Sequence, residues 1–309
     1  MAELPKTKDP VTDAAAAFPS PASMREDLMA LTKFRLSSLV IITTIVGYLA
    51  GSRLQPDWMI LLHTLIGTAC AAFGASIFNQ LMEIEPDALM KRTMDRPLPA
   101  RRIPPGQAFA MGCIVSTFGM LHLARMVTPE NPQAAYLAAL TLILYVLIYT
   151  PMKRRSSFNT VVGAVAGALP PVIGWMAAGR SYDAGAAVLF GILFFWQLPH
   201  FVAINWMYRE EYERAGFVMW SNNDVNGKLS AWLCLLFSVA LWAVCIWPCT
   251  LGLTDWGHGL VSVVSAGAMV ELSRRFLVHP TRAAARTVFF FTLLFLPVVL
   301  VSLLVFWRR

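Results

Sequence analysis

A polar segment with regularly spaced chemical groups, NQLMEIEPDALMKRTMDRPL at residues 79–98, follows an apolar stretch that lacks Asp, Glu, Lys and Arg. Asn79, Glu83 and Asp87 are four residues apart, a spacing that places side chains on one face of a helix. Two carboxylates and an amide oxygen suit Mg²⁺, which completes its coordination shell with water and phosphate. The spacing therefore predicts a metal–diphosphate site, with Pro86 expected to kink the helix. A solvated helix end is the alternative.

A second polar segment, WQLPHFVAINWMYREEYERAG at residues 196–216, combines groups at membrane depth with an acidic loop. Pro199 is expected to break or kink a span. His200 lies at or near membrane depth, where polar groups are costly and more often functional; a helix–helix hydrogen bond is the other interpretation. Glu210 and Glu211 then form a second acidic cluster. Two such clusters facing one compartment can hold two metal ions around one diphosphate.

Between these segments lies YTPMKRRSSFNTVVGAVAGALPPVIGW, residues 149–175, which begins with cations at the end of an expected span. Tyr149 and Lys153 are four residues apart, and Arg154 follows. Bases at such a position commonly only anchor topology, but beside acidic clusters they are plausible partners for a departing diphosphate. Deeper in the segment, Pro170–Pro171 is expected to interrupt the span.

The elements that must position these groups are membrane-spanning helices. Of the 309 residues, 57% are hydrophobic and only 14% are charged, whereas a soluble chain carries about a quarter charged residues. Apolar blocks of roughly twenty residues cross a bilayer as helices. We predict an all-α polytopic membrane protein with nine spans, the eighth being the weakest because it is short and contains Glu271. The spans are residues 36–52, 58–80, 105–124, 134–151, 158–179, 184–206, 229–249, 256–273 and 287–307.

The positions of the basic residues predict the orientation of these spans. In the nine-span arrangement, 20 of the 25 Lys and Arg residues fall on one side of the membrane, and short loops rich in these residues remain cytosolic. We therefore expect a multi-pass protein of the bacterial cytoplasmic (inner) membrane whose acidic loops face the cytosol. The net charge of +7 then reflects topology and anionic lipid headgroups, not nucleic acid.

The N-terminal residues lack the features of a targeting segment. Residues 1–30 have neither the apolar core of a signal peptide nor the Arg-rich, acid-poor composition of a transit peptide. They are rich in Pro and Ala. We predict a disordered cytosolic tail over residues 1–30 and a transmembrane domain over residues 31–309.

Residues 79–103, NQLMEIEPDALMKRTMDRPLPARRI, resemble the N-x-x-x-[DE]-x-x-x-D-x-x-M-x-R-T-x-x-R-P signature of the protoheme IX farnesyltransferase (heme O synthase) family, part of the UbiA superfamily. Residues 149–175 and 194–216 look like its second and third signature blocks, and the match covers most of residues 30–305. The resemblance implies a nine-helix intramembrane prenyltransferase. It also implies transfer of farnesyl from farnesyl diphosphate to a vinyl group of protoheme, with Mg²⁺ bound to the diphosphate and heme as a substrate, not a prosthetic group.

Carried onto this sequence, the resemblance makes Asn79, Glu83 and Asp87 both the first metal–diphosphate motif and part of the catalytic set. The residues that it implies in substrate binding, whether of the diphosphate or of the heme propionates, are Arg92, Arg96, Tyr149, Lys153, Arg154 and Asn159.

The second motif of the superfamily is degenerate here, because Ala215 stands four residues after Glu211 where another acid is expected. Glu211 is therefore the candidate second metal ligand, with Glu210 as the substitute. His200 is the candidate for orienting heme or handling a proton in the catalytic set.

The resemblance also implies binding partners, and two alternative functions remain. Its partners are farnesyl diphosphate, protoheme IX and membrane lipid, with heme A synthase or oxidase assembly factors as candidate protein partners and no nucleic acid. The alternatives are a UbiA-type prenyltransferase acting on a quinone precursor or other aromatic acceptor, and a transporter. Transporters place such polar groups near the membrane midplane, whereas here the acids and bases crowd one face, which favours the enzyme.

Overall fold

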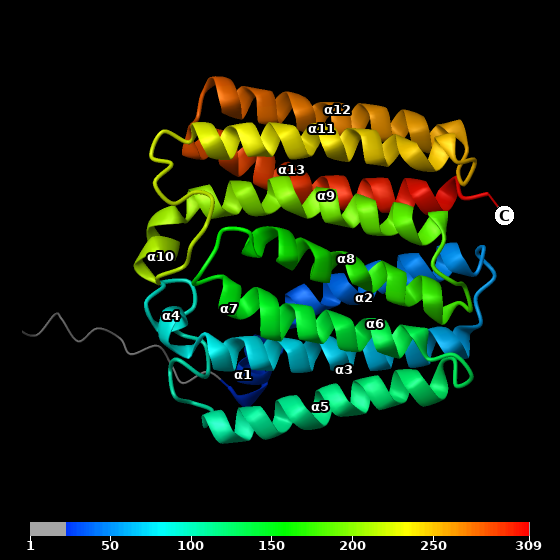
Figure 1. The fold of residues 1–309 in the computed structure, drawn as a ribbon, viewed down its shortest axis with the longest axis horizontal. Coiled ribbons are helices and arrows are strands. Elements are labelled where there is room, and N and C mark those ends of the chain that lie inside the picture. Colours follow the sequence, from blue (N-terminus) through cyan, green and yellow to red (C-terminus); the bar gives the residue numbers. More distant parts are fainter. Residues whose placement is uncertain (1–22, 309) are drawn as a thin grey trace, which may run out of the picture.

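The computed structural model describes residues 23–308, which form a bundle of long helices lying side by side (Figure 1). Within that range, the β interactions amount to one isolated antiparallel bridge between Thr254 and Trp307. The predicted all-α class is confirmed. The helices are α1 (Met24–Leu31), α2 (Phe34–Gly51), α3 (Trp58–Met82), α4 (Ile84–Ala88), α5 (Pro105–Met126), α6 (Gln133–Leu142), the π-helical segment η1 (Ile143–Tyr149), α7 (Thr150–Met152), α8 (Asn159–Ala177), α9 (Ala184–Met207), α10 (Arg209–Arg214), α11 (Lys228–Thr250), α12 (Trp256–Val278) and α13 (Arg282–Val305).

Each of the nine predicted spans coincides with a long helical segment, the fourth being composed of α6, η1 and α7. Eight of these segments are long and apolar enough to cross a membrane. In the described part of the chain, α12 is the one that falls short, because His258, Glu271 and several small residues reduce its mean hydropathy. It nevertheless runs for 23 residues and packs against α11 and α13. The count of nine is therefore approximate as a count of membrane spans.

Two expected helix breaks are absent. α8 continues through Pro170–Pro171, and α9 continues through Pro199. The predicted interruption at Pro170–Pro171 was wrong, and of the break or kink predicted at Pro199 the break is absent. A proline removes only one intrahelical hydrogen bond, and neighbouring helices hold the segment in place. Residues 168–177 of α8 are all buried, so the packing around these prolines is continuous.

The predicted disordered tail overlaps a helix. Residues 1–22 lie outside the described part of the chain, but residues 24–30 belong to α1. Ser23 and Glu26 cap its N-terminus reciprocally, each side chain accepting a hydrogen bond from the other's backbone N–H. Asp27 pairs with Arg102 at 2.7 Å. Disorder over residues 24–30 was therefore wrongly predicted, because capping and the ion pair of the buried Asp27 hold this helix against the bundle.

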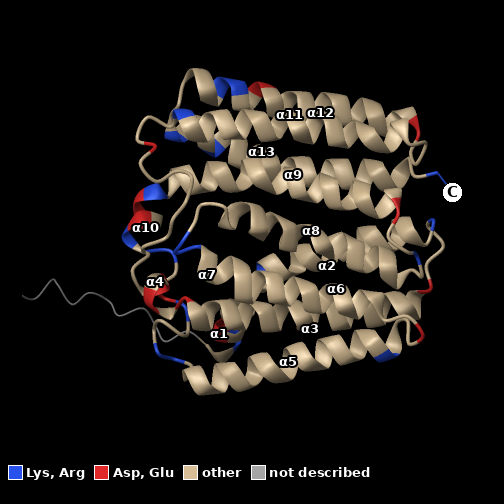
Figure 2. Ribbon diagram, in the orientation of Figure 1, with Lys and Arg blue, Asp and Glu red and all other residues tan. Residues whose placement is uncertain are grey.

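Charged side chains are concentrated at the two ends of the bundle (Figure 2). Acids and bases are densest where α4 and α10 lie, at the same end as α7 and the start of α2. The flanks of the long helices are almost free of charge, as a hydrocarbon environment requires. The end that carries α4 and α10 is therefore where charged chemistry is available.

Small residues let α2 and α8 approach closely at the centre of the bundle. A Cβ atom built on Gly47 would lie 1.8 Å from the Pro171 carbonyl oxygen, and one built on Gly174 would lie 2.1 Å from the Thr44 carbonyl oxygen. The clashing atoms belong to the backbone, so a rotamer change cannot relieve them. Small residues commonly permit such contacts between membrane helices.

We predict that Gly47→Ala destabilises the bundle by roughly 1–3 kcal/mol, the usual range for overpacking. Thermal unfolding in detergent should show a lower midpoint. The matched control is Gly267→Ala on α12, where a Cβ atom would meet nothing within 4 Å. Equal midpoints for the two variants would contradict the close approach of α2 and α8.

Candidate active site

The predicted carboxylate cluster forms where α3 gives way to α4. The sequence suggested one continuing helix kinked by Pro86, but α3 ends at Met82 and Glu83 is the residue between the helices, with φ −110°. Pro86 lies in the first turn of α4, where a missing N–H costs little. The expected kink was therefore misplaced. Because α4 begins directly after Glu83, both Glu83 and Asp87 still border the same space.

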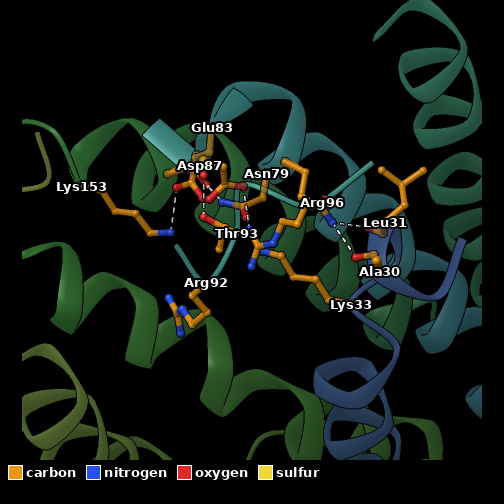
Figure 3. A network of polar contacts seen from close by, with 12 residues as sticks. Ala30, Leu31, Lys33, Asn79, Glu83, Asp87, Arg92, Thr93, Arg96 and Lys153 are labelled. Carbon is orange, nitrogen blue, oxygen red and sulfur yellow. Dashed lines mark hydrogen bonds and ion pairs between the residues drawn. The ribbon is translucent and has the colours of Figure 1, made fainter. Parts of the chain in front are cut away.

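Both carboxylates are buried and each is paired with a cation (Figure 3). Lys153 Nζ lies 2.7 Å from Glu83 Oε1, and Arg96 Nη1 lies 2.6 Å from Asp87 Oδ2. Burial opposes ionisation of Glu83, but the ammonium groups of Lys153 and Lys33 outweigh it and lower its pKa. Burial likewise disfavours the Lys153 ammonium, and Glu83 outweighs it and raises the pKa of Lys153. The Glu83–Lys153 pair is thus charged on both sides.

Asn79 lies behind these pairs and is held by two neighbours. Its Oδ1 accepts a hydrogen bond from Lys33 Nζ, and its Nδ2 donates to Thr150 Oγ1 at 2.9 Å. Lys33 comes from the connection between α1 and α2, where the chain turns with φ 47°. Burial lowers the pKa of Lys33 to about 7. In the sequence, Lys33 is only one of the basic residues near the first span, and its place at this site was not predicted.

A π-helical segment places two tyrosines at the inner wall of the site. In η1 the Thr150 N–H donates to the carbonyl of Tyr145, five residues earlier, and such wide turns often occur at functional sites. Tyr149 lies beneath Lys153, whose Nζ is 4.6 Å from the ring centroid. Tyr145, Tyr149 and Lys153 are spaced four apart in the sequence, and this spacing could have identified Tyr145, which was not predicted as a site residue.

These groups line a cavity of about 780 Å³ at the end of the bundle that carries α4 and α10. A second cavity of about 210 Å³ lies between apolar stretches of α2, α3, α6, α8 and α9. Leu36, Tyr145, Tyr149 and Phe201 line both cavities, so the charged cavity and the apolar one adjoin. The predicted site residues that line the charged cavity are Glu83, Asp87, Arg92, Arg96, Tyr149, Lys153 and Asn159.

Four predicted site residues do not line this cavity. Asn79 lies behind the ion pairs, where it contacts Lys33 and Thr150. Arg154 is exposed on the loop after α7. Glu211 borders a separate cavity of about 260 Å³ together with Arg209 and Arg282. His200 packs against α13, where its Nδ1 lies 2.7 Å from Thr292 Oγ1.

The oxygen ligands at this site fit Mg²⁺ bound together with a phosphate ligand. Within residues 23–308, no three His, Cys, Asp or Glu side chains lie close enough to hold a metal ion by themselves. Glu83 and Asp87 each use one carboxylate oxygen for their ion pair, which leaves the other for a cation. Mg²⁺ commonly binds through one or two carboxylates plus phosphate and water. The arrangement is therefore suited to a metal carried with a diphosphate.

Comparison with known proteins adds an independent line of argument. The model of the UbiA prenyltransferase family matches residues 40–296. A protoheme IX farnesyltransferase of Opitutus terrae is 40% identical over 282 residues, covering 90% of this chain and 94% of that protein. A human mitochondrial protoheme IX farnesyltransferase is 38% identical over 282 residues, covering 90% of this chain and 61% of that protein.

Two solved structures share the fold at low sequence identity. A structure of digeranylgeranylglyceryl phosphate synthase has a TM-score of 0.76 at 16% identity, covering 91% of this chain and 97% of that one. A structure of a UbiA homolog from Archaeoglobus fulgidus bound to GPP and Mg²⁺ has a TM-score of 0.62 at 11% identity. The match covers 90% of this chain and 99% of that one.

We predict that Asp87→Asn weakens the Mg²⁺-dependent binding of inorganic diphosphate by at least about tenfold, which corresponds to 1.4 kcal/mol. The amide keeps an oxygen for Arg96 but removes the charge that holds the metal. Calorimetry with and without Mg²⁺ measures the effect. The control is Glu85→Gln, which removes an exposed carboxylate of the same short helix. Equal diphosphate affinities of Asp87→Asn and Glu85→Gln in the presence of Mg²⁺ would contradict the assignment.

Proposed function

This chain belongs to the UbiA prenyltransferase family, and on that premise we propose that it is a membrane-embedded protoheme IX farnesyltransferase. It transfers farnesyl from farnesyl diphosphate to a vinyl group of protoheme and yields heme O and diphosphate. The observation that carries this function is the direct junction between a cavity lined by paired charges and an apolar cavity among the helices.

The junction matches a donor with a charged head and a long apolar tail. Arg92, Arg96 and Lys153 line the charged cavity and would bind the diphosphate, with Lys33 beside them. Asn79, Glu83 and Asp87 would hold Mg²⁺, which supplies further neutralisation of the leaving diphosphate when it is bound. The farnesyl chain would enter the apolar cavity, where burial of its hydrocarbon surface is favourable.

The chemistry requires charge neutralisation and exclusion of water. As the carbon–oxygen bond of farnesyl diphosphate breaks, its electron pair stays with the diphosphate, whose added charge the basic side chains stabilise. The allylic cation accepts the π electrons of the heme vinyl group, and a carbon–carbon bond forms. Water then adds at the adjacent carbon and a proton is released, leaving a hydroxyethyl group. Tyr145 and Tyr149 stand where the two cavities meet and help to separate the cation from bulk water.

The acceptor assignment rests on the relatives. Proteins named protoheme IX farnesyltransferase match about nine-tenths of this chain at 38–40% identity. Protoheme is a flat, mostly apolar molecule with two carboxylates, which suits a site at the boundary between membrane and water. Heme A synthase and oxidase assembly factors are candidate protein partners for the product.

We further propose that the charged cavity faces the cytosol of a bacterium whose inner membrane holds the protein. The proposal is supported by the excess of Lys and Arg in the segments and short loops at the end of the bundle that carries α4 and α10.

We expect purified protein given protoheme, farnesyl diphosphate and Mg²⁺ to produce a more hydrophobic heme that carries a farnesyl-hydroxyethyl group. Chromatography and mass spectrometry identify this product directly. A folded preparation that leaves protoheme unchanged but prenylates 4-hydroxybenzoate would retain the family and overturn the heme acceptor.

The orientation is tested with single cysteines in a background that lacks the five native cysteines. Cysteines at Lys91 and Lys228 should resist an impermeant thiol reagent in intact cells and react after permeabilisation. A cysteine at Arg125, at the opposite end of the bundle, should react in intact cells. Reaction of the first two positions in intact cells would invert the proposed topology.

A further inference from the structure

The apolar cavity of about 210 Å³ begins at Tyr149, which also lines the charged cavity. Two contacts place this mouth at one level on three neighbouring helical segments. Asn79 of α3 donates a hydrogen bond to Thr150 Oγ1 at 2.9 Å. A Cβ atom built on Gly163 of α8 would lie 2.7 Å from the Tyr149 ring. The long helices lie side by side (Figure 1), so residue counts from this level measure depth along each helix.

Three lining residues lie deepest in the cavity, each on a different helix. Measured from the mouth, Thr68 of α3 and Ala138 of α6 are each 11 residues along their helices, and Ile173 of α8 is ten. At 1.5 Å of rise per residue, all three lie about 15 Å from the mouth. Three helices thus reach the end of the cavity at a common depth.

The cavity is closed at these three residues, which we call the floor. Thr68, Ala138 and Ile173 are each only 2% exposed. One turn further from the mouth, Thr64 on α3 and Ala134 on α6 are completely buried. The close backbone contact between α2 and α8 lies directly beside Ile173. A chain that reaches the floor therefore meets packed side chains and backbone instead of further space.

The walls between the mouth and the floor leave room for a narrow chain because many of their side chains are small. α3 contributes Ala71, Ala72 and Ala75, and α8 contributes Ala166 and Gly167. Helix backbones and methyl groups make up these two walls. A flexible hydrocarbon chain fits such a channel, and burial of its surface there is favourable.

The depth of the channel matches one prenyl length. The main chain of a farnesyl group has twelve carbons and spans roughly 14 Å when fully extended, since each carbon–carbon bond is about 1.5 Å long. One isoprene unit more or fewer changes this length by about 5 Å. A geranyl group would leave the lower part of the channel empty. A geranylgeranyl group would have to displace the floor.

We propose that Thr68, Ala138 and Ile173 set the length of the prenyl donor by closing this channel at the depth of a farnesyl chain. The inference rests on the proposed function and assigns its donor specificity to residues outside the charged cavity. The diphosphate holds one end of the donor among the bases, so a longer chain cannot avoid the floor by moving outward without leaving them.

The preference of the wild type is measured by equilibrium binding of prenyl diphosphates with Mg²⁺ to the full-length protein in nanodiscs. Protoheme is left out, and empty nanodiscs give the background. Farnesyl diphosphate should bind at least about tenfold more tightly than geranylgeranyl diphosphate. If the channel were open at its lower end or along its side, the longer chain would bind at least as tightly, because it buries more hydrocarbon. That result would overturn the proposal.

Substitutions should move the length limit in both directions. Ile173→Ala removes part of the floor and should reduce the preference for farnesyl over geranylgeranyl diphosphate by at least about threefold. Ala71→Leu and Ala72→Leu fill the channel about 5 Å nearer the mouth than Thr68. Each should bind geranyl diphosphate as wild type does and lose at least about tenfold in affinity for farnesyl diphosphate. Each result compares two donors on the same folded protein, so altered stability does not imitate it.

The matched control is Ala139→Leu, which adds the same side chain to α6 at a position that does not line the cavity. It should keep the donor preferences of the wild type. Preferences that stay unchanged in Ile173→Ala and in both leucine variants would overturn the role of the floor, as would an equal shift in Ala139→Leu.

Product analysis separates this proposal from the proposed function. If the wild type farnesylates protoheme while the channel variants keep its donor preference, the function stands and the role of the floor is refuted. If the variants shift the donor preference in a protein that leaves protoheme unchanged, the role of the floor stands and the heme acceptor is refuted.

Discussion

Pairing of buried charges at one end of the bundle is the constraint on which the site depends. Glu83 and Asp87 are almost fully buried, and a buried carboxylate without a partner costs several kcal/mol. Their partners Lys153 and Arg96 come from different segments. The Glu83–Lys153 pair ties the end of α3 to the residue that follows α7, and the Asp87–Arg96 pair ties α4 to the loop after it. The need for neutralisation therefore also fixes the shape of the cavity.

The same pairing prepares the site for a charged ligand. The ammonium and guanidinium groups that neutralise the carboxylates are the groups that a diphosphate would contact, and they already stand in a confined space. Glu83 and Asp87 would hold a metal ion carried with a diphosphate, and Lys153 and Arg96 would neutralise the phosphate oxygens. Each carboxylate and each basic side chain would then keep a partner of opposite charge. Groups that are already in place can stabilise the charge of a leaving diphosphate at low cost.

The sequence predicted the spans and the closeness of Glu83 and Asp87, because hydropathy and four-residue spacing are local properties. It failed where neighbouring packing decides the outcome. α8 and α9 tolerate their prolines because surrounding helices support them. Two local backbone features could not be predicted from composition. One is the π-helical segment that contains Tyr145, and the other is the left-handed conformation of Lys33. Glu211 is acidic and well placed in sequence, yet rotation around α10 directs it to another cavity.

The bases that would serve the diphosphate are distinguished by where they lie. Arg92, Arg96 and Lys153 surround the carboxylates, so they share a space in which a metal-bound diphosphate is the matching anion. Both substrates are amphiphiles with an anionic end and an apolar body. The membrane boundary accommodates such molecules because charge can stay near water while hydrocarbon is buried.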